Sequence, residues 1–445
     1  MRNAKGSFRS CLFLTGLLCV QGLSAQPDRA ASARTPIVLT ETPAGGQPRL
    51  VLAVPGGTAR VLSHGFYAAA DPQVSWDAKR ILFAGKKTAG EPWQIFEMTL
   101  ATGAIRQLTR MSADCRQPAY QSKIFSLDIP DPWPQAAFIC GGALYTVKFD
   151  GTLRQRITFT PWEESSPAML PDGMMVFSSR QGSRTHLMAV NLDGTDYSLY
   201  VPGDRPREPA ATLDGRLVFV EGEGALAAVD LVRPLYTKRV LTRQGDGIYS
   251  SPSPLPDGRL LVAWQKDASS PPGIYRFNPA NGTRVPVYVK PGVSATQPRG
   301  VFPRPVPEGR GSVVEEEAGW SRLYCLSVFT TDRPDLVRPG QPWRLRVYTG
   351  SPSNLLKMGD LRIEDDGSFH LDVPPNTPLK MELVNRDGKV VRSSSWVYTR
   401  PKENRGCIGC HEDPELTPEN REAKAVIRKP VKLAAPAIPT NGGSR

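Results

Sequence analysis

The sequence lacks the features on which most membrane, nucleotide-binding and hydrolytic proteins depend. Beyond its N-terminus, no segment approaches the roughly 18 apolar residues that a transmembrane helix needs. The glycines form no phosphate-binding loop, and neither a GxSxG nucleophile elbow nor an HExxH zinc motif occurs. Only four histidines occur among 445 residues. The common hydrolase, kinase and metalloprotease chemistries therefore have no motif in this sequence, and its scattered Ser, His and Asp residues single out no catalytic triad.

Acidic residues are also in deficit. The chain has 55 Lys and Arg residues against 43 Asp and Glu residues, a formal net charge of +12. A basic surface suits an acidic protein partner or an anionic membrane face. Because the chain has neither a nucleic-acid recognition motif nor a clustered basic stripe, we expect no nucleic-acid partner.

The N-terminus has the pattern of a secretory signal. Arg2, Lys5 and Arg9 precede the apolar run CLFLTGLLCVQGL, and small residues end it before Gln26. We expect residues 1–25 to be a cleaved signal peptide, which predicts a periplasmic or secreted protein without a transmembrane segment. An uncleaved anchor is the alternative.

Five of the seven cysteines lie beyond this signal. In an oxidising compartment Cys115 and Cys140 could form a disulfide, or each could be a separate buried thiol. Cys325 lies in the strand-like run SRLYCLSVF, where a core position is expected.

An internal repeat runs through the first two thirds of the chain. Prolines recur every 42 to 49 residues, and Asp-Gly turns followed by apolar strands come after several of them. The repeat prolines are Pro72, Pro118, Pro167, Pro209, Pro252 and Pro298. Each repeat fits four short antiparallel strands, the pattern of a β-propeller blade.

The repeat predicts an all-β, two-domain fold. The N-terminal strands lack an opening proline segment, whereas the Pro298 segment lacks later strands, so the two together would complete a sixth blade. We expect a six-bladed β-propeller over residues 36–310, with seven blades as the alternative. Alternating strands around Asp-Gly turns predict a small antiparallel β-sandwich over 311–400. Residues 401–416 would hold a haem motif, and 417–445 would form an extended or disordered tail.

The sequence GCIGCH contains Cys407, Cys410 and His411. Two thiols at this spacing followed by histidine are typical of c-type haem attachment, in which the thiols form thioethers and the imidazole approaches the iron. We therefore predict one covalent haem c held by these three residues, with His411 as the metal ligand. Zinc is an alternative, but it would need further ligands such as Glu412 and Asp413. A redox dithiol or an inert disulfide also remains open.

The second axial ligand of such a haem is not determined by the sequence. Each candidate also has an ordinary structural interpretation as a core or surface residue. The candidates are His370, Met358, Met381, His64, His186 and Glu415. Trp396 and Tyr398 either pack near the haem or are ordinary strand residues.

Two stretches carry a resemblance to a known family. The segment DGSFHLDVPPNTPLKMEL, followed by SSSWVYTRPKENRGCIGCHED, resembles hydrazine synthase alpha-subunit-like proteins. DPQVSWDAKRILFAGKK resembles their TolB-like (PD40, WD40-like) blades. The resemblance implies a TolB-like propeller before a small β domain with a CxxCH motif, and it extends over nearly the whole chain after the signal.

This chain also differs from the family that it resembles. The alpha subunits are longer and have two haem motifs. In them a tyrosine four residues beyond the motif histidine binds the iron, and the motif histidine binds zinc; Glu415 stands at that tyrosine position here. Only Cys407, Cys410 and His411 carry over, so hydrazine synthesis is not expected.

Three functions are compatible with these patterns. The first is an exported mono-haem c-type protein that transfers electrons or binds a small molecule, with a redox partner or envelope protein docking on the propeller. The second is a TolB-like interaction propeller with a structural CxxCH motif. The third is a haem-dependent oxidoreductase related to the hydrazine synthase alpha subunit. We favour the first, and the oligomeric state is left open.

Overall fold

The structure, a computed structural model, describes residues 34–126, 131–410, 413, 415 and 422–436. The expected signal peptide, His411 and Glu412 lie outside the described residues. Every named element in the described part is a β-strand, which confirms the all-β prediction. Nothing helical in that part has the length and apolarity that crossing a bilayer would demand.

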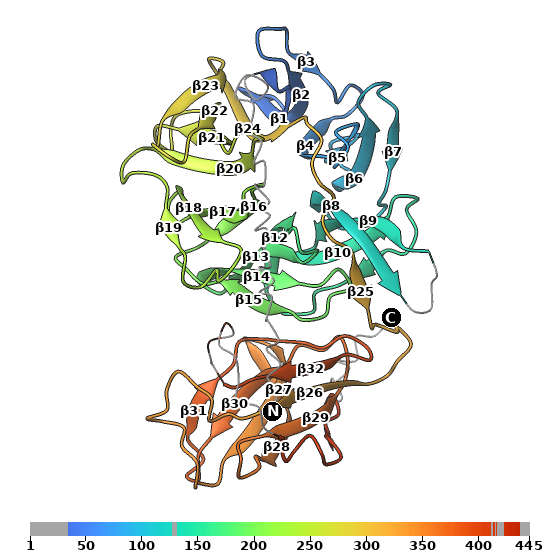
Figure 1. The fold of residues 1–445 in the computed structure, drawn as a ribbon. Helices are drawn as coiled ribbons and strands as arrows, with labels where there is room; N and C mark the ends of the chain where they lie inside the picture. The colour runs from blue at the N-terminus through green and yellow to red at the C-terminus, as the bar shows by residue number, and fades with distance from the viewer. Residues whose placement is uncertain (1–33, 127–130, 411–412, 414, 416–421, 437–445) are drawn as a thin grey trace, which may run out of the picture.

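The strands between Ile37 and Ser312 form a β-propeller, with its sheets standing around a common centre (Figure 1). Among the described residues the ring contains six sheets. The first sheet contains β1 (Ile37–Pro43), β2 (Arg49–Ala53) and β3 (Arg60–Val61) with β24 (Val293–Gly300), and the second contains β4 (Ala68–Val74), β5 (Arg80–Lys86), β6 (Gln94–Thr99) and β7 (Ile105–Gln107). The third contains β8 (Cys115–Ser126), β9 (Trp133–Cys140), β10 (Ala143–Lys148) and β11 (Gln155–Arg156) with β25 (Arg310–Ser312), and the fourth contains β12 (Glu163–Met169), β13 (Met175–Gln181), β14 (Arg184–Val190) and β15 (Ser198–Val201). The fifth contains β16 (Arg207–Ala211), β17 (Arg216–Glu221), β18 (Ala225–Asp230) and β19 (Arg239–Val240), and the sixth contains β20 (Ile248–Pro254), β21 (Leu260–Gln265), β22 (Gly273–Phe277) and β23 (Arg284–Tyr288).

The hydrophobic core of the ring lies between neighbouring sheets. Val176 and Leu187 of one sheet, for example, pack with Leu217 and Phe219 of the next. Central strands are buried on both faces, as in β5, so they read as continuous apolar runs. Neighbouring sheets therefore share their cores around the ring.

Main-chain pairing joins the two ends of the ring. β24 lies antiparallel to β1, with Ile37 opposite Gly300 and Pro43 opposite Val293. The segment after β24 then crosses the middle of one propeller face (Figure 1). It is held there by main-chain hydrogen bonds from Arg304 to the Trp76 carbonyl (2.8 Å) and from Glu308 to the Pro171 carbonyl (3.0 Å). It ends in β25, which adds to β8 as a parallel strand.

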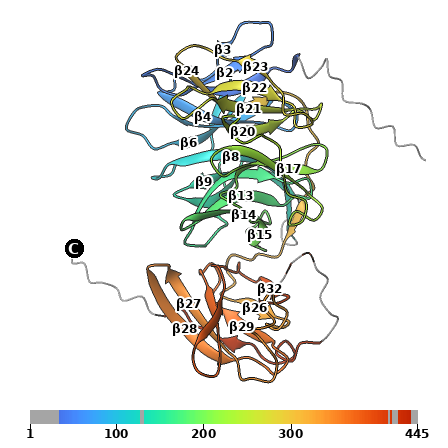
Figure 2. The same ribbon diagram turned by 90° about the vertical axis from the view of Figure 1, so that its left-hand side faces the viewer.

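The second domain consists of two four-stranded sheets on a shared core, and it lies against the rim of the propeller beside β14 and β15 (Figure 2). Leu323 and Leu371 from one sheet and Val347 and Leu383 from the other are buried in this core. One sheet contains β26 (Ser321–Cys325), β29 (Phe369–Val373), β32 (Asn404–Cys407) and β33 (Val431–Lys432); the other contains β27 (Arg344–Ser351), β28 (Asn354–Arg362), β30 (Lys380–Val384) and β31 (Val390–Ser393).

The described part of the C-terminal segment packs on this second domain. β33 pairs with β29, and Ala423, Ala425 and Leu433 are buried. A few small and apolar side chains therefore anchor the described part of the expected tail to the sheet, and residues 437–445 lie outside the described residues.

The structure resolves the cysteine alternatives in the propeller. Cys115 and Cys140 form a disulfide between β8 and β9, where they lie directly opposite each other with Cα atoms 4.2 Å apart. Cys325 is 1% exposed and belongs to the core of the second domain, as expected from its apolar strand.

We predict that the double substitution Cys115→Ala/Cys140→Ala lowers the free energy of unfolding by about 3 kcal/mol, because a disulfide that spans 25 residues restricts the unfolded chain. Urea unfolding of both proteins, with and without dithiothreitol, measures this effect. The reductant should shift the wild-type midpoint and leave that of the double variant in place. Equal stability of the two oxidised proteins would contradict the prediction.

Candidate functional site

The motif cysteines lie at the end of β32 and in the loop that follows. β32 runs parallel to β26, and this places Cys407 directly opposite Cys325. The loop is tied to the segment after β26 by main-chain hydrogen bonds from Leu326 to the Cys407 carbonyl (2.9 Å) and from Cys410 to the Thr330 carbonyl (2.9 Å). The cysteine loop therefore has a defined path over the second domain.

Two glycines permit this close approach. A Cβ atom at Gly406 would come within 2.6 Å of the Tyr324 hydroxyl oxygen, and one at Gly409 would overlap the Thr330 carbonyl. A larger residue at Gly406 would displace the Tyr324 ring or the loop, and one at Gly409 would push the loop away from the Thr330 main chain. The glycines of GCIGC thus have a packing role that is separate from any cofactor.

Both motif thiols are half-buried and pack at the edge of the second-domain core. Both residues are therefore partly accessible. Within the described residues, no group of three or more His, Cys, Asp or Glu side chains is arranged to hold a metal ion. His411 and Glu412, which the haem and zinc hypotheses need, lie outside those residues.

The residues just before the cysteines form the contact between the two domains. Arg400 is 1% exposed. Its Nε donates to the Asp193 carbonyl of the propeller (2.9 Å), one terminal nitrogen donates to the Asn376 side chain (2.6 Å), and the other forms an ion pair with Glu316. The guanidinium also lies 5.0 Å from the Phe159 ring centroid. We call this arrangement the Arg400 clamp.

Tyr398 and Glu403 extend the same contact. The buried Tyr398 hydroxyl lies between two propeller carbonyls, those of Ile157 (2.8 Å) and Gly194 (2.9 Å). Glu403 accepts the main-chain N–H of Asp196 (3.0 Å) and that of Arg400 (2.6 Å). Burial raises the pKa of Glu403. The sequence analysis left Tyr398 as a haem neighbour or a strand residue; in the structure it binds the propeller.

A buried carboxyl group lies behind this interface. Glu164 accepts hydrogen bonds from Thr160 (3.0 Å) and Tyr197 (3.5 Å), and the Tyr197 ring packs 5.3 Å from that of Tyr398. Burial raises the pKa of Glu164 from 4.5 to about 8. The neutral acid is therefore the favoured form in the folded protein near pH 7. No sequence pattern marked this residue.

The candidate axial ligands are scattered. His370 on β29 stacks edge-on against Tyr324, 6.1 Å between ring centroids. Met358 and Met381 pack against the second-domain core. His64 is exposed on the propeller, whereas His186 on β14 is half-buried, and its burial lowers its pKa.

Glu415 is held by the propeller. Its carboxylate accepts the main-chain N–H of Leu235 (2.8 Å) and lies 3.4 Å from Nε of Arg233. Both partners belong to the loop between β18 and β19. The structure thus gives this carboxylate a role in joining the end of the cysteine loop to the propeller.

The centre of the propeller contains a feature that the sequence analysis missed. In each inner strand, the residue before the repeat proline has a positive φ, between 52° and 57°, at a register shift of the sheet. These residues are Asp71, Gln117, Ser166, Glu208, Ser251 and Gln297. Such bulges re-aim side chains. A polar residue before each repeat proline was the available signal.

Several of these side chains link one sheet to the next around the centre. The Gln297 side-chain oxygen accepts the main-chain N–H of Asp71 (2.9 Å), the Asp71 carboxylate accepts that of Gln117 (3.1 Å), and the Gln117 oxygen accepts that of Ser166 (2.8 Å). The Glu208 carboxylate likewise accepts the main-chain N–H of Ser251. The long polar side chains thus bridge adjacent sheets, whereas a serine is too short to do so.

Comparisons with known proteins agree with this architecture. The family model of the hydrazine synthase alpha subunit middle domain matches residues 349–412. The chain is 25% identical to hydrazine synthase subunit alpha of Kuenenia stuttgartiensis over 79% of its own length, and it spans 61% of that relative. The solved structure of Kuenenia stuttgartiensis hydrazine synthase superposes with a TM-score of 0.77 at 22% identity, over 88% of this chain and 71% of that one. TolB from Acinetobacter baumannii matches 60% of this chain and 67% of its own, with a TM-score of 0.47 and 16% identity.

We predict that Arg400→Met makes the two domains unfold independently of each other. The substitution removes the hydrogen bonds of Arg400 to the Asp193 carbonyl and the Asn376 side chain and its ion pair with the partly exposed Glu316, and it should cost about 2–4 kcal/mol. Differential scanning calorimetry should then show two transitions, or an earlier transition of the second domain. Lys402→Met is the matched control, because its 43% exposed side chain forms a surface ion pair with Glu315. An unchanged melting curve for Arg400→Met would contradict the role of the clamp.

Glu164 should make stability fall as the pH rises. Its folded pKa is above the unfolded value, so its stabilising effect is complete below about pH 4.5 and is lost as the pH passes through about 8. Between these limits, wild type should lose up to about 1.4 kcal/mol per pH unit relative to Glu164→Gln. Urea unfolding at several pH values measures the slope. Glu163→Gln, a substitution at the exposed neighbouring residue, should keep the wild-type dependence of stability on pH. If Glu164→Gln also kept that dependence, Glu164 would not be its source.

Proposed function

We propose that the chain is an exported mono-haem c-type protein. In this proposal a six-bladed propeller serves as a docking platform, and a β-sandwich domain carries the haem. Cys407 and Cys410 would form the two thioethers, and His411 would bind the iron. The haem, once bound, would supply one-electron redox chemistry or a site for a small ligand.

The observation that carries the proposal is the placement of the two cysteines. Their thiols are half-buried, and the chain on both sides is anchored, by β32 and the Arg400 clamp before the loop and by Glu415 after it. A redox centre in a loop fixed in this way keeps its position relative to the propeller, so a partner that docks on the propeller meets it at a constant distance. Reorganisation during electron transfer is thereby kept small.

The likeness to the hydrazine synthase alpha subunit favours a second candidate, a haem oxidoreductase that acts on small nitrogen compounds. The family match includes both cysteines and His411. Glu415 argues against this candidate, because its carboxylate already binds Leu235 and Arg233 of the propeller. A third candidate, an interaction propeller with a structural CxxCH motif, needs no haem.

Expression in a periplasm that matures c-type cytochromes, followed by haem staining of a denaturing gel, tests the proposal. Wild type and Cys325→Ala should stain, since Cys325 lies beside the motif without being part of it. Cys407→Ala/Cys410→Ala should not stain. A folded, unstained wild type would overturn the proposal and favour the interaction propeller. Among stained proteins, a spectral change with carbon monoxide would favour the small-molecule or enzymatic function over simple electron transfer.

A further inference from the structure

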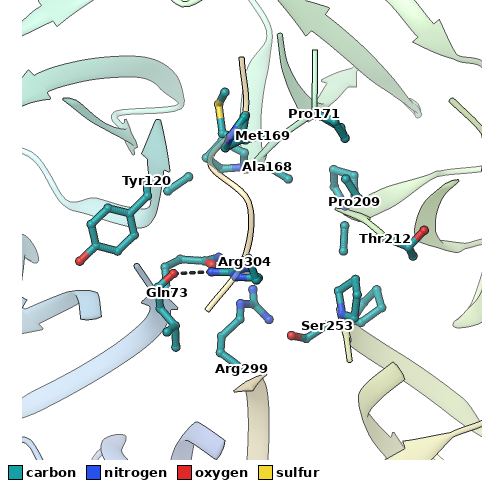
Figure 3. A pocket seen from close by; sticks show the side chains of 18 of the residues that line it. Gln73, Tyr120, Ala168, Met169, Pro171, Pro209, Thr212, Ser253, Arg299 and Arg304 are labelled. Atoms are coloured by element: carbon teal, nitrogen blue, oxygen red, sulfur yellow. Dashed lines mark hydrogen bonds between the residues drawn. The ribbon is translucent and has the colours of Figure 1, made fainter. Parts of the chain in front are cut away.

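The middle of the propeller encloses a cavity of about 660 Å³ that has no role in the proposal above (Figure 3). Its wall is rich in proline rings, such as Pro171 and Pro209, and it also includes Trp76, Tyr120 and Met169. The segment that follows β24 passes beside the cavity and contributes to its lining. The cavity is therefore largely apolar, and it is large enough for a small organic molecule.

Two arginines from different elements enter this apolar space. Arg299 comes from β24 and Arg304 from the crossing segment, and their side chains lie close to each other in Figure 3. Arg299 donates to the Pro298 carbonyl (2.9 Å), and Arg304 donates to the Val74 carbonyl. Arg304 also lies 4.9 Å from the Trp76 ring centroid. Among the described residues, no carboxylate oxygen is within 4.0 Å of either guanidinium.

Arg299 and Arg304 are half-buried, and burial weakens the solvation of both guanidinium groups. Burial lowers the pKa of Arg299 to about 10, and burial together with the charge of Arg299 lowers that of Arg304 to about 10. The Nε of Arg304 is buried and has no hydrogen-bond partner among the described atoms. Two positive charges side by side in an apolar cavity are unfavourable unless an anion accompanies them.

Three acidic residues line the cavity, and two of them, Asp71 and Glu208, are already engaged, whereas Glu308 is exposed. Asp71 is paired with Arg116 (2.9 Å) and also bonds to Gln297, while Glu208 accepts the main-chain N–H of Ser251. These carboxylates act in the links between sheets described above. Their charges act on Arg299 from a distance, but neither carboxylate forms a direct ion pair with Arg299 or Arg304.

We propose that the central cavity binds a small organic carboxylate, held at its charged end by Arg299 and Arg304 and along its body by the proline-rich wall. The planar guanidinium fork matches a carboxylate. The apolar lining favours an organic anion over inorganic phosphate, whose remaining oxygens would be desolvated without donors. This site involves neither the cysteine loop nor any haem, so it does not depend on the proposed function.

Binding of benzoate to the full chain tests the proposal, with isothermal calorimetry as the measurement. Benzoate should bind saturably, whereas benzamide, its neutral analogue, and inorganic phosphate should bind at least tenfold more weakly. Arg299→Gln and Arg304→Gln should each weaken benzoate binding at least tenfold. Arg239 lies at the surface on the outer strand β19, where it is paired with Asp230 of β18. Arg239→Gln should therefore leave benzoate binding unchanged. Equal binding of benzamide, a preference for phosphate, or unchanged binding to both arginine variants would overturn the proposal.

A second measurement uses the wild type alone, in case the variants do not fold. Phenylglyoxal, which modifies arginine and is similar in size to benzoate, should label Arg299 and Arg304, as read by peptide mass spectrometry. Benzoate should reduce labelling of these two residues several-fold without protecting Arg239. Equal labelling with and without benzoate, or no labelling of the two arginines at all, would count against an accessible carboxylate site.

Discussion

Burial of the Arg400 guanidinium fixes the relation of the two domains. A buried charge is costly unless it is paired and fully hydrogen-bonded, and here the partners come from three separate parts of the chain. They are the propeller carbonyl of Asp193, the carboxylate of Glu316 after the crossing segment, and the side chain of Asn376 in the second domain. Any shift between the domains would leave several of these groups unsatisfied. β32, which leads into the cysteine loop, begins four residues later. The clamp therefore also sets the position of that strand and loop.

A second constraint operates inside the propeller. Each inner strand bulges at the residue before a proline, and the longer side chains at these positions accept main-chain hydrogen bonds from the next sheet. Together with the pairing of β1 and β24, they hold the sheets around a shared centre. The same geometry brings Arg299 and Arg304 into one apolar cavity although they come from different elements. The centre of the ring is therefore both a structural junction and the strongest candidate for a small-ligand site.

The likeness to the hydrazine synthase alpha subunit extends over 79% of the chain in sequence and 88% in structure, and the family model matches the second domain. The matched region, residues 349–412, contains Arg400, Glu403 and both motif cysteines. The clamp thus lies within the part of the chain where the likeness is specific. Glu415 lies just beyond the matched region, and its carboxylate binds the loop between β18 and β19.

The sequence by itself determined the local features: the all-β class, the short strands between Asp-Gly turns, the spacing of Cys407 and Cys410, and the core position of Cys325. These follow from periodicity and turn chemistry, which act between near neighbours. Only the tertiary structure decided that Cys115 pairs with Cys140, that Tyr398 and Arg400 bind the propeller, and that Arg299 and Arg304 share a cavity. Each of these depends on contacts between segments far apart in the chain. Whether a buried polar residue is a strand residue, an interdomain bond or a ligand site is set by what the fold places opposite it.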